Sequence, residues 1–273
     1  MLNASIVLYN HTIAEIELLI ASLRQSGRVE KIYLIDNSPQ KNTEFSKFPV
    51  EYIFNNKNLG YGTGHNIAIR KTIEQQVSYH LVVNPDIQFN SIILEELLNF
   101  MNQNQDVGHL MPNVLYPNGE TQYLCKLLPK PSDLFFRRFL PSKWTKKSND
   151  RFELRRFGYD KVMEVPYLSG CFMLLRTKTL KEVGLFDERF FMYPEDIDLT
   201  RRIHQKYKTV FYPHVNIVHH HAHASYQNVK FLGVHLWNLI KYFNKWGWFF
   251  DSERKKVNNE TLKKLGIGRK VNL

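Results

Sequence analysis

Residues 58–86 of the 273-residue chain read Asn58-Leu-Gly-Tyr-Gly-Thr-Gly-His-Asn66, continue through about Gln75, and end in Tyr79-His-Leu-Val-Val-Asn-Pro-Asp86. The glycine-dense opening predicts a loop that feeds a helix, and the apolar run Tyr79–Val83 predicts a buried strand. Asn-Pro-Asp directly after that run is typical of a turn. Loop, helix, strand and turn in this order belong to a βαβ unit, so the segment predicts a parallel sheet.

The same alternation continues on both sides of this segment. We expect strands at residues 4–9, 31–36, 52–54, 108–111, 209–212 and 215–219, and helices that begin at the capping box Thr12-Ile-Ala-Glu15 and at about Ser91. Strands that alternate with helices at this spacing predict an α/β fold, in which a Rossmann-like, mostly parallel central sheet is flanked by helices.

The composition is that of a globular protein with a buried core. Hydrophobic residues make up 43% of the chain and charged residues 23%, which excludes a disordered chain. Cys125 and Cys171 are too few for a disulfide framework, so we expect a reducing, cytoplasmic compartment. The sequence has no apolar run of about 18 residues, the length that a membrane-spanning helix needs, and we expect no leader peptide at Met1.

The net charge of +11 is concentrated in two segments. Residues 126–161 hold 11 Lys and Arg against 4 Asp and Glu, and residues 226–273 hold 10 against 3. Anionic partners are therefore expected at these segments rather than at the sheet. Charge alone also suggests a basic nucleic-acid-binding protein, but the sequence contains no recognisable nucleic-acid module, so no nucleic acid is expected as a partner.

Carboxylates follow two of the predicted strands. Asp36 ends the run 31–36, and Asp86 lies in the turn after Val83. In open α/β sheets ligands bind in the crevice at the carboxyl ends of the strands, which favours a nucleotide site. Each aspartate alone is equally consistent with an Asx-turn.

The glycine segment 60–66 also has two interpretations. Amides at a helix N-terminus can hold an anion, whereas a plain turn into the helix is the default reading. The segment matches neither the P-loop nor the Gly-x-Gly-x-x-Gly fingerprint, so it supports neither an ATP cradle nor a dinucleotide site.

The densest acidic cluster is Glu195-Asp196-Ile-Asp198, at the start of a predicted helix. The helix dipole stabilises negative charge there, but repulsion between like charges also raises carboxylate pKa values, which suits a general base or a metal site. Four histidines lie within residues 219–223, more than one metal ion needs. Cys125 and Cys171 have no ligand spacing, so a cysteine zinc site is not expected.

Residues 226–273 form a basic, aromatic-rich tail. Apolar residues recur there at helical spacing and predict an amphipathic helix; they are Leu232, Leu236, Leu239, Ile240 and Phe243. One interpretation is that this face packs on the rest of the protein. The other is an interfacial anchor on anionic lipid, because Trp237, Trp246 and Trp248 lie among basic residues.

The motifs form an ordered set: Asn10, Ile-Asp36-Asn-Ser, Asn58-x-Gly60-x-Gly-x-Gly64-x-Asn66, Asn84-Pro-Asp86, Ser169-Gly170, Gly184-x-Phe-Asp187-Glu, Glu195-Asp196-x-Asp198-Leu and His219-x-His221-x-x-x-Ser225. Over about residues 3–225 this set resembles family 2 inverting glycosyltransferases, most closely the bacterial rhamnosyltransferase-like branch. The resemblance implies a GT-A fold, a nucleotide-diphosphate sugar donor, Mg²⁺ or Mn²⁺, and inversion at the anomeric carbon by single displacement.

The resemblance also implies a division of the chain. Residues 1–225 would be the catalytic domain, with a nucleotide-binding half at about 1–113, a basic excursion at about 114–161 and an acceptor half at about 162–225. Residues 226–273 would be a helical extension.

Carried over by position, the resemblance gives roles to the site residues. Asp36 would accept a hydrogen bond from N3–H of uracil or thymine, and Asp86 and His219 would bind the cation. Asp196, beside Glu195, would be the base for the acceptor hydroxyl. Further residues at the donor would be Asn10, Gly60, Gly64, Asn66, Asn84 and Gly170. Asn84 replaces the first carboxylate of the Asp-x-Asp motif of many relatives, so we expect modest metal affinity.

We therefore expect an inverting glycosyltransferase of surface-polysaccharide (O-antigen or capsule) synthesis, with dTDP-rhamnose as the leading donor and a saccharide as acceptor. A UDP-hexose or UDP-N-acetylhexosamine donor is the alternative, because both pyrimidines present the same groups to Asp36. A sugar-nucleotide binder without turnover is a third option, which the intact Glu195-Asp196 pair argues against. An acceptor on a lipid diphosphate would place a peripheral enzyme at the inner face of the membrane.

Overall fold

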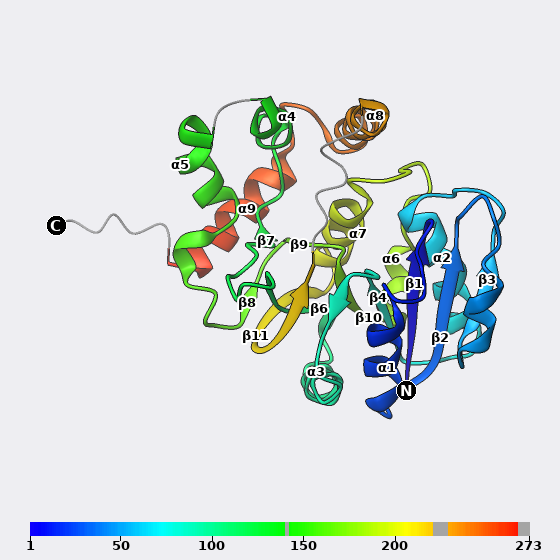
Figure 1. Ribbon diagram of the computed structural model, residues 1–273. Coiled ribbons are helices and arrows are strands. Elements are labelled where there is room, and N and C mark those ends of the chain that lie inside the picture. The colour runs from blue at the N-terminus through cyan, green and yellow to red at the C-terminus, as the bar shows by residue number, and fades with distance from the viewer. Residues whose placement is uncertain (140–141, 221–228, 267–273) are drawn as a thin grey trace.

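The computed structural model describes residues 1–139, 142–220 and 229–266 of the chain (Figure 1). Within those residues a mixed sheet forms the centre of the protein, in the strand order β3-β2-β1-β4-β10-β6-β11-β5, with β8 paired to β11. The strands of this sheet are β1 (Leu2–Leu8), β2 (Val29–Asp36), β3 (Glu51–Phe54), β4 (Tyr79–Val83), β5 (Ile87–Gln88), β6 (Val107–Leu115), β8 (Met163–Glu164), β10 (Phe172–Arg176) and β11 (Lys208–His219). A small second sheet pairs β7 (Cys125–Lys126) with β9 (Tyr167–Leu168).

Helices cover both faces of the central sheet, as the alternation predicts. They are α1 (Glu17–Gln25), α2 (Tyr61–Glu74), α3 (Ile93–Gln103), α4 (Pro131–Phe139), α5 (Ser142–Phe152), α6 (Thr177–Val183), α7 (Glu195–His204), α8 (Val229–Trp246) and α9 (Ser252–Lys264), with the 3-10 helices η1 (Thr43–Lys47) and η2 (Arg155–Phe157). Strand β4 shows the two faces: Leu81 and Val83 join the core with α1 and α3, whereas Val82 joins the core with α2, α6 and α7. Alternate side chains of a strand point to opposite faces, so a strand covered on both sides is apolar throughout.

The first strands are parallel, and β5, β8 and β10 add antiparallel pairings. β1 pairs in parallel with β2 and β4, and β2 with β3. β10 then lies antiparallel between β4 and β6, with Phe172 opposite Val83. The strands expected at 209–212 and 215–219 are one continuous strand, β11, whose register shifts between Tyr212 and Asn216. Pro213 lies in that interval and has no amide hydrogen for the ladder, which accounts for the bulge.

The excursion and the tail pack together on one side of the molecule. Figure 1 shows α4, α5 and α9 grouped beyond the β11 side of the sheet, with α8 above α7. The predicted helix of the tail is present as α8, and Leu239, Tyr242 and Phe243 of α8 are buried. No pattern predicted α9, whose buried residues include the polar Arg254 and Asn258. None of the helices within the described ranges is long and apolar enough to cross a membrane.

Candidate functional site

The carboxyl ends of β1, β2 and β4 bring several of the predicted residues to one edge of the sheet. Leu8 lies opposite Asp36 at the ends of β1 and β2. The amide of Asn10 donates to Ser38 Oγ at 2.7 Å, and the amide of Asn84 donates to the Cys171 carbonyl at 2.9 Å. Parallel strands end on the same side, so this edge is the crevice in which α/β sheets hold ligands.

Asp36 is fully buried, and both of its carboxylate oxygens accept hydrogen bonds. The Ser38 amide donates to Oδ1 at 2.9 Å, which closes an Asx-turn, and the Tyr52 hydroxyl donates to Oδ2 at 2.7 Å. Burial and the neighbouring carboxylate raise the pKa of Tyr52 to about 12, so Tyr52 keeps its proton at neutral pH. Each carboxylate oxygen has a second lone pair, so the side chain retains the capacity to accept a further donor.

His11 lies at the same edge, and the sequence patterns did not single it out. Burial lowers the pKa of His11, and the carboxylates of Glu15, Asp86 and Asp36 act in the opposite direction. His11 is therefore close enough to both strand-end aspartates to interact with their charge. A single histidine after a strand belongs to no recognisable motif, and this explains why only its neighbour Asn10 was predicted.

Helix α2 already begins at Tyr61, so Gly64 lies in its first turns rather than in the predicted loop, and both Gly60 and Gly64 are needed for close packing. A Cβ atom on Gly60, whose φ is +83°, would lie 2.1 Å from the Phe191 carbonyl oxygen, and one on Gly64 would lie 2.8 Å from Val7 Cγ2. The Tyr61 amide donates to the Phe191 carbonyl at 3.0 Å, and the Gly60 amide donates to Asn58. These contacts favour the packing interpretation of the loop over an anion cradle.

Asn66 connects α2 to the segment before the acidic cluster. Its Nδ2 donates to the Phe186 carbonyl at 2.9 Å and to Glu188 at 3.0 Å, and its Oδ1 accepts from the Phe186 amide at 3.0 Å. The side chain is fully buried. This pattern indicates a structural clamp rather than a direct contact with a donor.

Asp86 and His219 meet at the edge, as the resemblance implied. Asp86 Oδ1 lies 3.3 Å from His219 Nε2. Gln122 contacts His219 twice: Oε1 lies 3.0 Å from His219 Nδ1, and Nε2 donates to the His219 carbonyl at 2.9 Å. An amide oxygen can only accept, so Nδ1 donates to Gln122, and Nε2 is the ring nitrogen that lies toward Asp86.

The positions of Asp86 and His219 fit a divalent cation that is bound partly by the protein and partly by the sugar-nucleotide donor. Two neighbouring octahedral ligands at about 2.1 Å from a cation lie roughly 3 Å apart, close to the Asp86–His219 separation. In the part of the chain that the structure describes, no group of three or more His, Cys, Asp or Glu side chains gathers at one point. The protein would therefore supply Asp86 and His219, and donor oxygens or waters would complete the coordination. His221, His223 and Ser225 of the same predicted motif lie outside the described residues.

Glu195 and Asp196 open α7 beside Gly170. Asp196 Oδ2 accepts from the Gly170 amide at 3.0 Å and from the Tyr167 hydroxyl at 3.3 Å, and Oδ1 accepts from the Ile197 amide at 2.8 Å. Asp196 is partly buried, whereas Glu195 is buried. Gly170 has little room for a side chain, because a Cβ atom there would lie 3.0 Å from Asp196 Cβ and would press on the carboxylate that Gly170 holds.

Burial determines the protonation of this pair more than repulsion does. Desolvation raises the pKa of Asp196, and hydrogen bonds from Gly170 and Ile197 oppose it. Desolvation raises the pKa of Glu195 well above its ordinary value, and the charge of Asp196 adds to it. Asp196 is thus the member held ready as an anion, and Glu195 is the member that tends to keep its proton.

Asp196 and Asp86 both lie near Cys171. Burial raises the pKa of the Cys171 thiol to about 12, and both aspartates add to the effect. Cys171 follows Gly170, whose amide holds Asp196, and its carbonyl accepts the Asn84 amide. The short turn 169–171 therefore links the predicted base to the predicted metal motif.

Asp198 does not belong to the candidate site. It is fully buried, and its carboxylate accepts from Arg202 Nε at 2.9 Å, from Trp246 Nε1 at 2.8 Å and from Lys245 Nζ at 2.6 Å. Trp246 and Lys245 belong to α8, so the Asp198 carboxylate anchors that helix to α7. The interpretation of three carboxylates as one cluster is therefore corrected to a pair and a structural anchor.

Helix α8 also supports the loop that precedes the pair. Lys245 Nζ binds Asp187 at 2.8 Å, Lys241 Nζ donates to the Arg189 carbonyl at 2.7 Å, and Asn238 Nδ2 donates to the Met192 carbonyl at 2.9 Å. The lysines that fall off the apolar stripe thus have partners in the catalytic part. The apolar residues Leu239 and Phe243 are buried, as the packing interpretation expects, but Lys241 and Lys245 bind the protein instead of being solvated only.

Comparisons with known proteins identify the family. A model of the family described as glycosyl transferase family 2 matches residues 5–184, more than half of the chain. An N-acetylglucosaminyl-diphospho-decaprenol L-rhamnosyltransferase of Mycobacterium tuberculosis (strain CDC 1551 / Oshkosh) is 27% identical over 224 residues, 77% of this chain and 73% of that protein. Rhamnosyltransferase WbbL of Escherichia coli (strain K12) is 26% identical over 194 residues, 67% of this chain and 69% of that protein.

Two solved structures share the fold at low sequence identity. GalNAc-T7 with UDP, GalNAc and Mn²⁺ has a TM-score of 0.59 at 15% identity, over 80% of this chain and 43% of that one. S. aureus TarS has a TM-score of 0.58 at 14% identity, over 99% of this chain and 44% of that one. This chain thus spans less than half of either structure. The family match and the shared architecture show that the chain belongs to glycosyl transferase family 2, has the GT-A fold and is similar to rhamnosyltransferases of that family.

Proposed function

We propose that the protein is an inverting, metal-dependent glycosyltransferase with dTDP-rhamnose as its donor. It would transfer rhamnose to a hydroxyl of a saccharide that is carried on a lipid diphosphate. The reaction would be a step in the assembly of a bacterial surface polysaccharide. The observation that carries the proposal is Asp196, which three hydrogen bonds hold at the start of α7. The two rhamnosyltransferase relatives support the choice of sugar, and the name of the mycobacterial relative supports the type of acceptor.

The chemistry follows from the positions of the carboxylates. Asp196 takes the proton of the acceptor hydroxyl as its oxygen bonds to the anomeric carbon. The bond from that carbon to the diphosphate oxygen breaks at the same time, and the diphosphate leaves with the electron pair. A cation bound by Asp86 and His219 would neutralise the charge of the leaving diphosphate. Glu195, buried behind the base, keeps its proton and so does not compete for that of the acceptor.

Asp36 would select a pyrimidine nucleotide but would not distinguish a thymine nucleotide from a uracil nucleotide. Its carboxylate can accept only, and N3–H is present in both thymine and uracil. A UDP-hexose or UDP-N-acetylhexosamine donor is therefore the second candidate, and the fold of GalNAc-T7, crystallised with UDP and Mn²⁺, favours keeping it.

The experiment is a hydrolysis and transfer screen over dTDP-rhamnose, UDP-hexoses and UDP-N-acetylhexosamines, each with and without Mn²⁺. We expect metal-dependent release of the nucleoside diphosphate from dTDP-rhamnose. Turnover of a UDP-sugar instead would replace the donor. Tight binding of donors without any turnover would support a binder, and RNA or DNA affinity that falls steeply with salt would support the nucleic-acid alternative.

Peripheral attachment to the inner face of a membrane is also part of the proposal. Its support is the aromatic segment after α8, where Phe249 and Phe250 are 80% and 98% exposed. Lysines and arginines of the tail would add attraction to anionic lipid. The two cysteines are free and buried, which agrees with the expected reducing compartment.

A further inference from the structure

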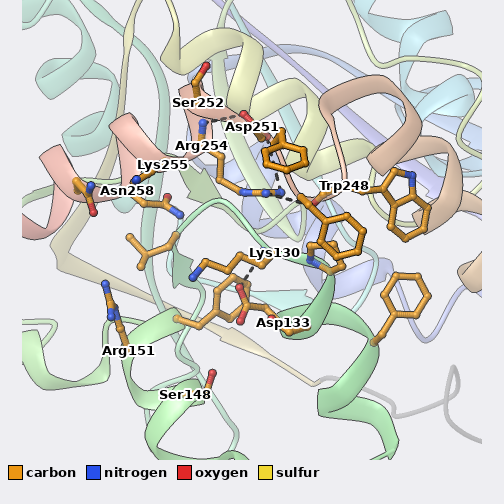
Figure 2. Close-up of a pocket in the computed structure, with 18 of the residues that line it drawn as sticks. Lys130, Asp133, Ser148, Arg151, Trp248, Asp251, Ser252, Arg254, Lys255 and Asn258 are labelled. Carbon is orange, nitrogen blue, oxygen red and sulfur yellow. Dashed lines mark hydrogen bonds and ion pairs between the residues drawn. The ribbon is translucent and has the colours of Figure 1, made fainter.

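A large cavity lies apart from the proposed catalytic carboxylates. It has a volume of about 1680 Å³ and lies between the excursion, with α4, α5 and η2, and the segment that joins α8 to α9 (Figure 2). None of the residues of the candidate site lines it. Pockets for drug-sized ligands measure roughly 300–1,000 Å³, so this volume suits a longer molecule.

The walls of the cavity are aromatic and aliphatic. Phe135 of α4 stacks on Trp248, with ring centroids 6.1 Å apart and an angle of 20° between the rings. Further apolar lining residues are Leu127, Phe152, Phe157 and Ile240. Phe249 and Phe250 also line the cavity and are mostly exposed, so its opening presents apolar side chains to water. Covering such a surface with a hydrocarbon chain is favourable, because it removes apolar area from water.

Charged side chains of both signs line the cavity: the carboxylates are Asp133, Asp150 and Asp251, of which Asp251 is paired with Arg201. Lys130, Arg151, Arg156 and Lys255 line the cavity, are exposed, and form no ion pair with any residue that the structure describes. Figure 2 shows Lys130 and Lys255 projecting from opposite walls, with Arg151 farther along the α5 side. Arg254 is different, because its guanidinium donates to the Pro129 and Trp248 carbonyls and thus holds the segment in place.

A short path leads from the cavity to the base. Leu127 lines the cavity, and the preceding Lys126 lies over the Tyr167 ring, with its Nζ 5.2 Å from the ring centroid. The Tyr167 hydroxyl binds Asp196. Phe135 and Trp248 pack in the same apolar cluster as Tyr167. A ligand in the cavity would therefore contact the elements that hold the base.

We propose that this cavity binds the lipid part of the acceptor: an isoprenoid chain between the aromatic walls, with its diphosphate bound by Lys130, Arg151, Arg156 and Lys255. The inference rests on the proposed function and assigns its acceptor to a surface. An apolar interior with a cationic rim matches an amphiphile that has a hydrocarbon body and a doubly charged head. A nucleotide sugar is a poorer match for this cavity, because it has no long apolar part that could contact the aromatic walls.

The test uses the full chain and farnesyl diphosphate as the probe, with farnesol and inorganic diphosphate for comparison. Binding is followed by calorimetry and by the tryptophan fluorescence of the chain, to which Trp248 in the cavity wall contributes. We expect farnesyl diphosphate to bind at least tenfold more tightly than either comparison compound. Equal affinity for farnesol would leave an apolar pocket without a diphosphate site, and equal affinity for inorganic diphosphate would leave a charge patch without a chain site. Either result would overturn the proposal.

Neighbouring lysines of α9 provide matched variants. Lys255 lines the cavity, whereas Lys256 is equally exposed and does not. We expect Lys255→Glu combined with Arg151→Glu to weaken farnesyl diphosphate binding at least tenfold, and Lys256→Glu to leave it within twofold. Equal losses would indicate nonspecific attraction and contradict the assignment.

A parallel titration with dTDP-rhamnose and Mn²⁺ separates this inference from the proposed function. If the variant with Lys255→Glu and Arg151→Glu loses farnesyl diphosphate binding but keeps donor binding, the result supports the assignment of the cavity to the lipid part of the acceptor. If farnesyl diphosphate binds and no sugar nucleotide does, the proposed donor chemistry fails while the cavity assignment stands. If donors turn over and farnesyl diphosphate does not bind, the cavity assignment fails alone.

Discussion

Arg201 of α7 and Asp251, directly before α9, form a buried bidentate pair: Nη1 lies 2.8 Å from Oδ2 and Nη2 lies 2.8 Å from Oδ1. The side chains are 2% and 3% exposed. The Arg201 guanidinium also lies over the Trp246 ring, 3.9 Å from its centroid. Helix α7, which begins with Glu195 and Asp196, is thus tied to the end of α8 and the start of α9, and the tail is part of the folded unit.

Asp251→Ala should destabilise the protein by about 3–5 kcal/mol, because it leaves the Arg201 charge buried without its main partner. Urea unfolding followed by circular dichroism measures this change. Glu253→Ala is the matched control. Glu253 also binds Arg201 but is 33% exposed, so we expect a loss of no more than about 1 kcal/mol. If both variants lose a similar amount of unfolding free energy, the buried bidentate pair does not stabilise the protein more than the exposed Glu253 contact does.

The sequence predicted α8 but not α9, and the contacts of the two helices explain the difference. The apolar stripe of α8, with Leu239 and Phe243, is a local pattern that any amphipathic helix shows. The buried contacts of α9 are polar and distant in sequence: Asn258 Oδ1 accepts from the Leu128 amide, and Arg254 donates to the Pro129 carbonyl. Hydrogen bonds between residues so far apart leave no periodicity in the sequence.

Asp196→Asn should abolish transfer while leaving donor affinity nearly unchanged. The amide keeps the shape of the side chain but cannot take the hydroxyl proton, a loss of about 10²–10⁴-fold in kcat. Donor titration by calorimetry and transfer kinetics measure the two effects separately. Turnover within about tenfold of the unaltered protein would remove Asp196 from this role. If Glu195→Gln were the inactive variant instead, the roles within the pair would be exchanged.

The rate of transfer should rise with pH through the pKa of Asp196. Burial raises that pKa, and only the ionised carboxylate can accept a proton. The ascending limb of a plot of kcat against pH should therefore lie above the pH at which an ordinary aspartate ionises. A rate that stays constant down to pH 4 would contradict a base with a raised pKa.

Asp86→Ala and His219→Ala should each weaken Mn²⁺-dependent donor binding, because the two side chains face each other across 3.3 Å. Gln122→Leu should have the same effect at about 10–100-fold, since Gln122 fixes the ring of His219 without touching the cation. Calorimetric titration of Mn²⁺ in the presence of donor measures all three.

His220→Ala is the control for the metal site. The His220 side chain is exposed, and only the backbone amide of the residue donates to the Asp86 carbonyl. We expect unchanged metal affinity. A His219→Ala variant with unaltered metal dependence would reduce that residue to a strand-end histidine.

Gln122 also shows how far the site could be predicted. Asp36, Asp86, Asp196 and His219 lie next to strand ends or helix starts, where a local pattern marks them. Their roles remain predictions, although the fold and the family are confirmed. Gln122 lies in the irregular segment after β6, and its contact with His219 spans 97 residues. No local signal separates such a glutamine from any other loop residue.

The protein should lose stability as the pH falls below about 6.5. Burial lowers the pKa of His80 and of His109 to about 3 from an ordinary value of 6.5. Above pH 6.5 both rings are neutral whether the chain is folded or not. Between pH 6.5 and 3 the unfolded chain binds protons that the folded one does not, so stability falls by about 2 kcal/mol per ring at pH 5.

His109→Leu should remove part of this loss. Neither ring nitrogen of His109 has a hydrogen-bond partner among the described residues, so leucine removes a buried polar group. Urea unfolding at pH 8 and pH 5 should show a smaller difference for the variant than for the unaltered chain. His214→Gln, at an exposed position, should not change that difference. A difference equal to that of the unaltered chain would show that His109 does not titrate as described.

Membrane attachment needs point variants, because truncation after Ser225 would remove Asp251 and expose α7. Phe249 and Phe250 are 80% and 98% exposed, so Phe249→Ser with Phe250→Ser removes apolar surface without opening the core. We expect the intact chain to sediment with anionic liposomes, less so as salt rises, and the double variant to bind at least tenfold more weakly. Leu18→Ser is the control, because Leu18 on α1 is 59% exposed and far from the tail in Figure 1. If the intact chain stays off anionic liposomes at every salt concentration, the exposed phenylalanines do not act at a membrane, and α8 is explained by packing alone.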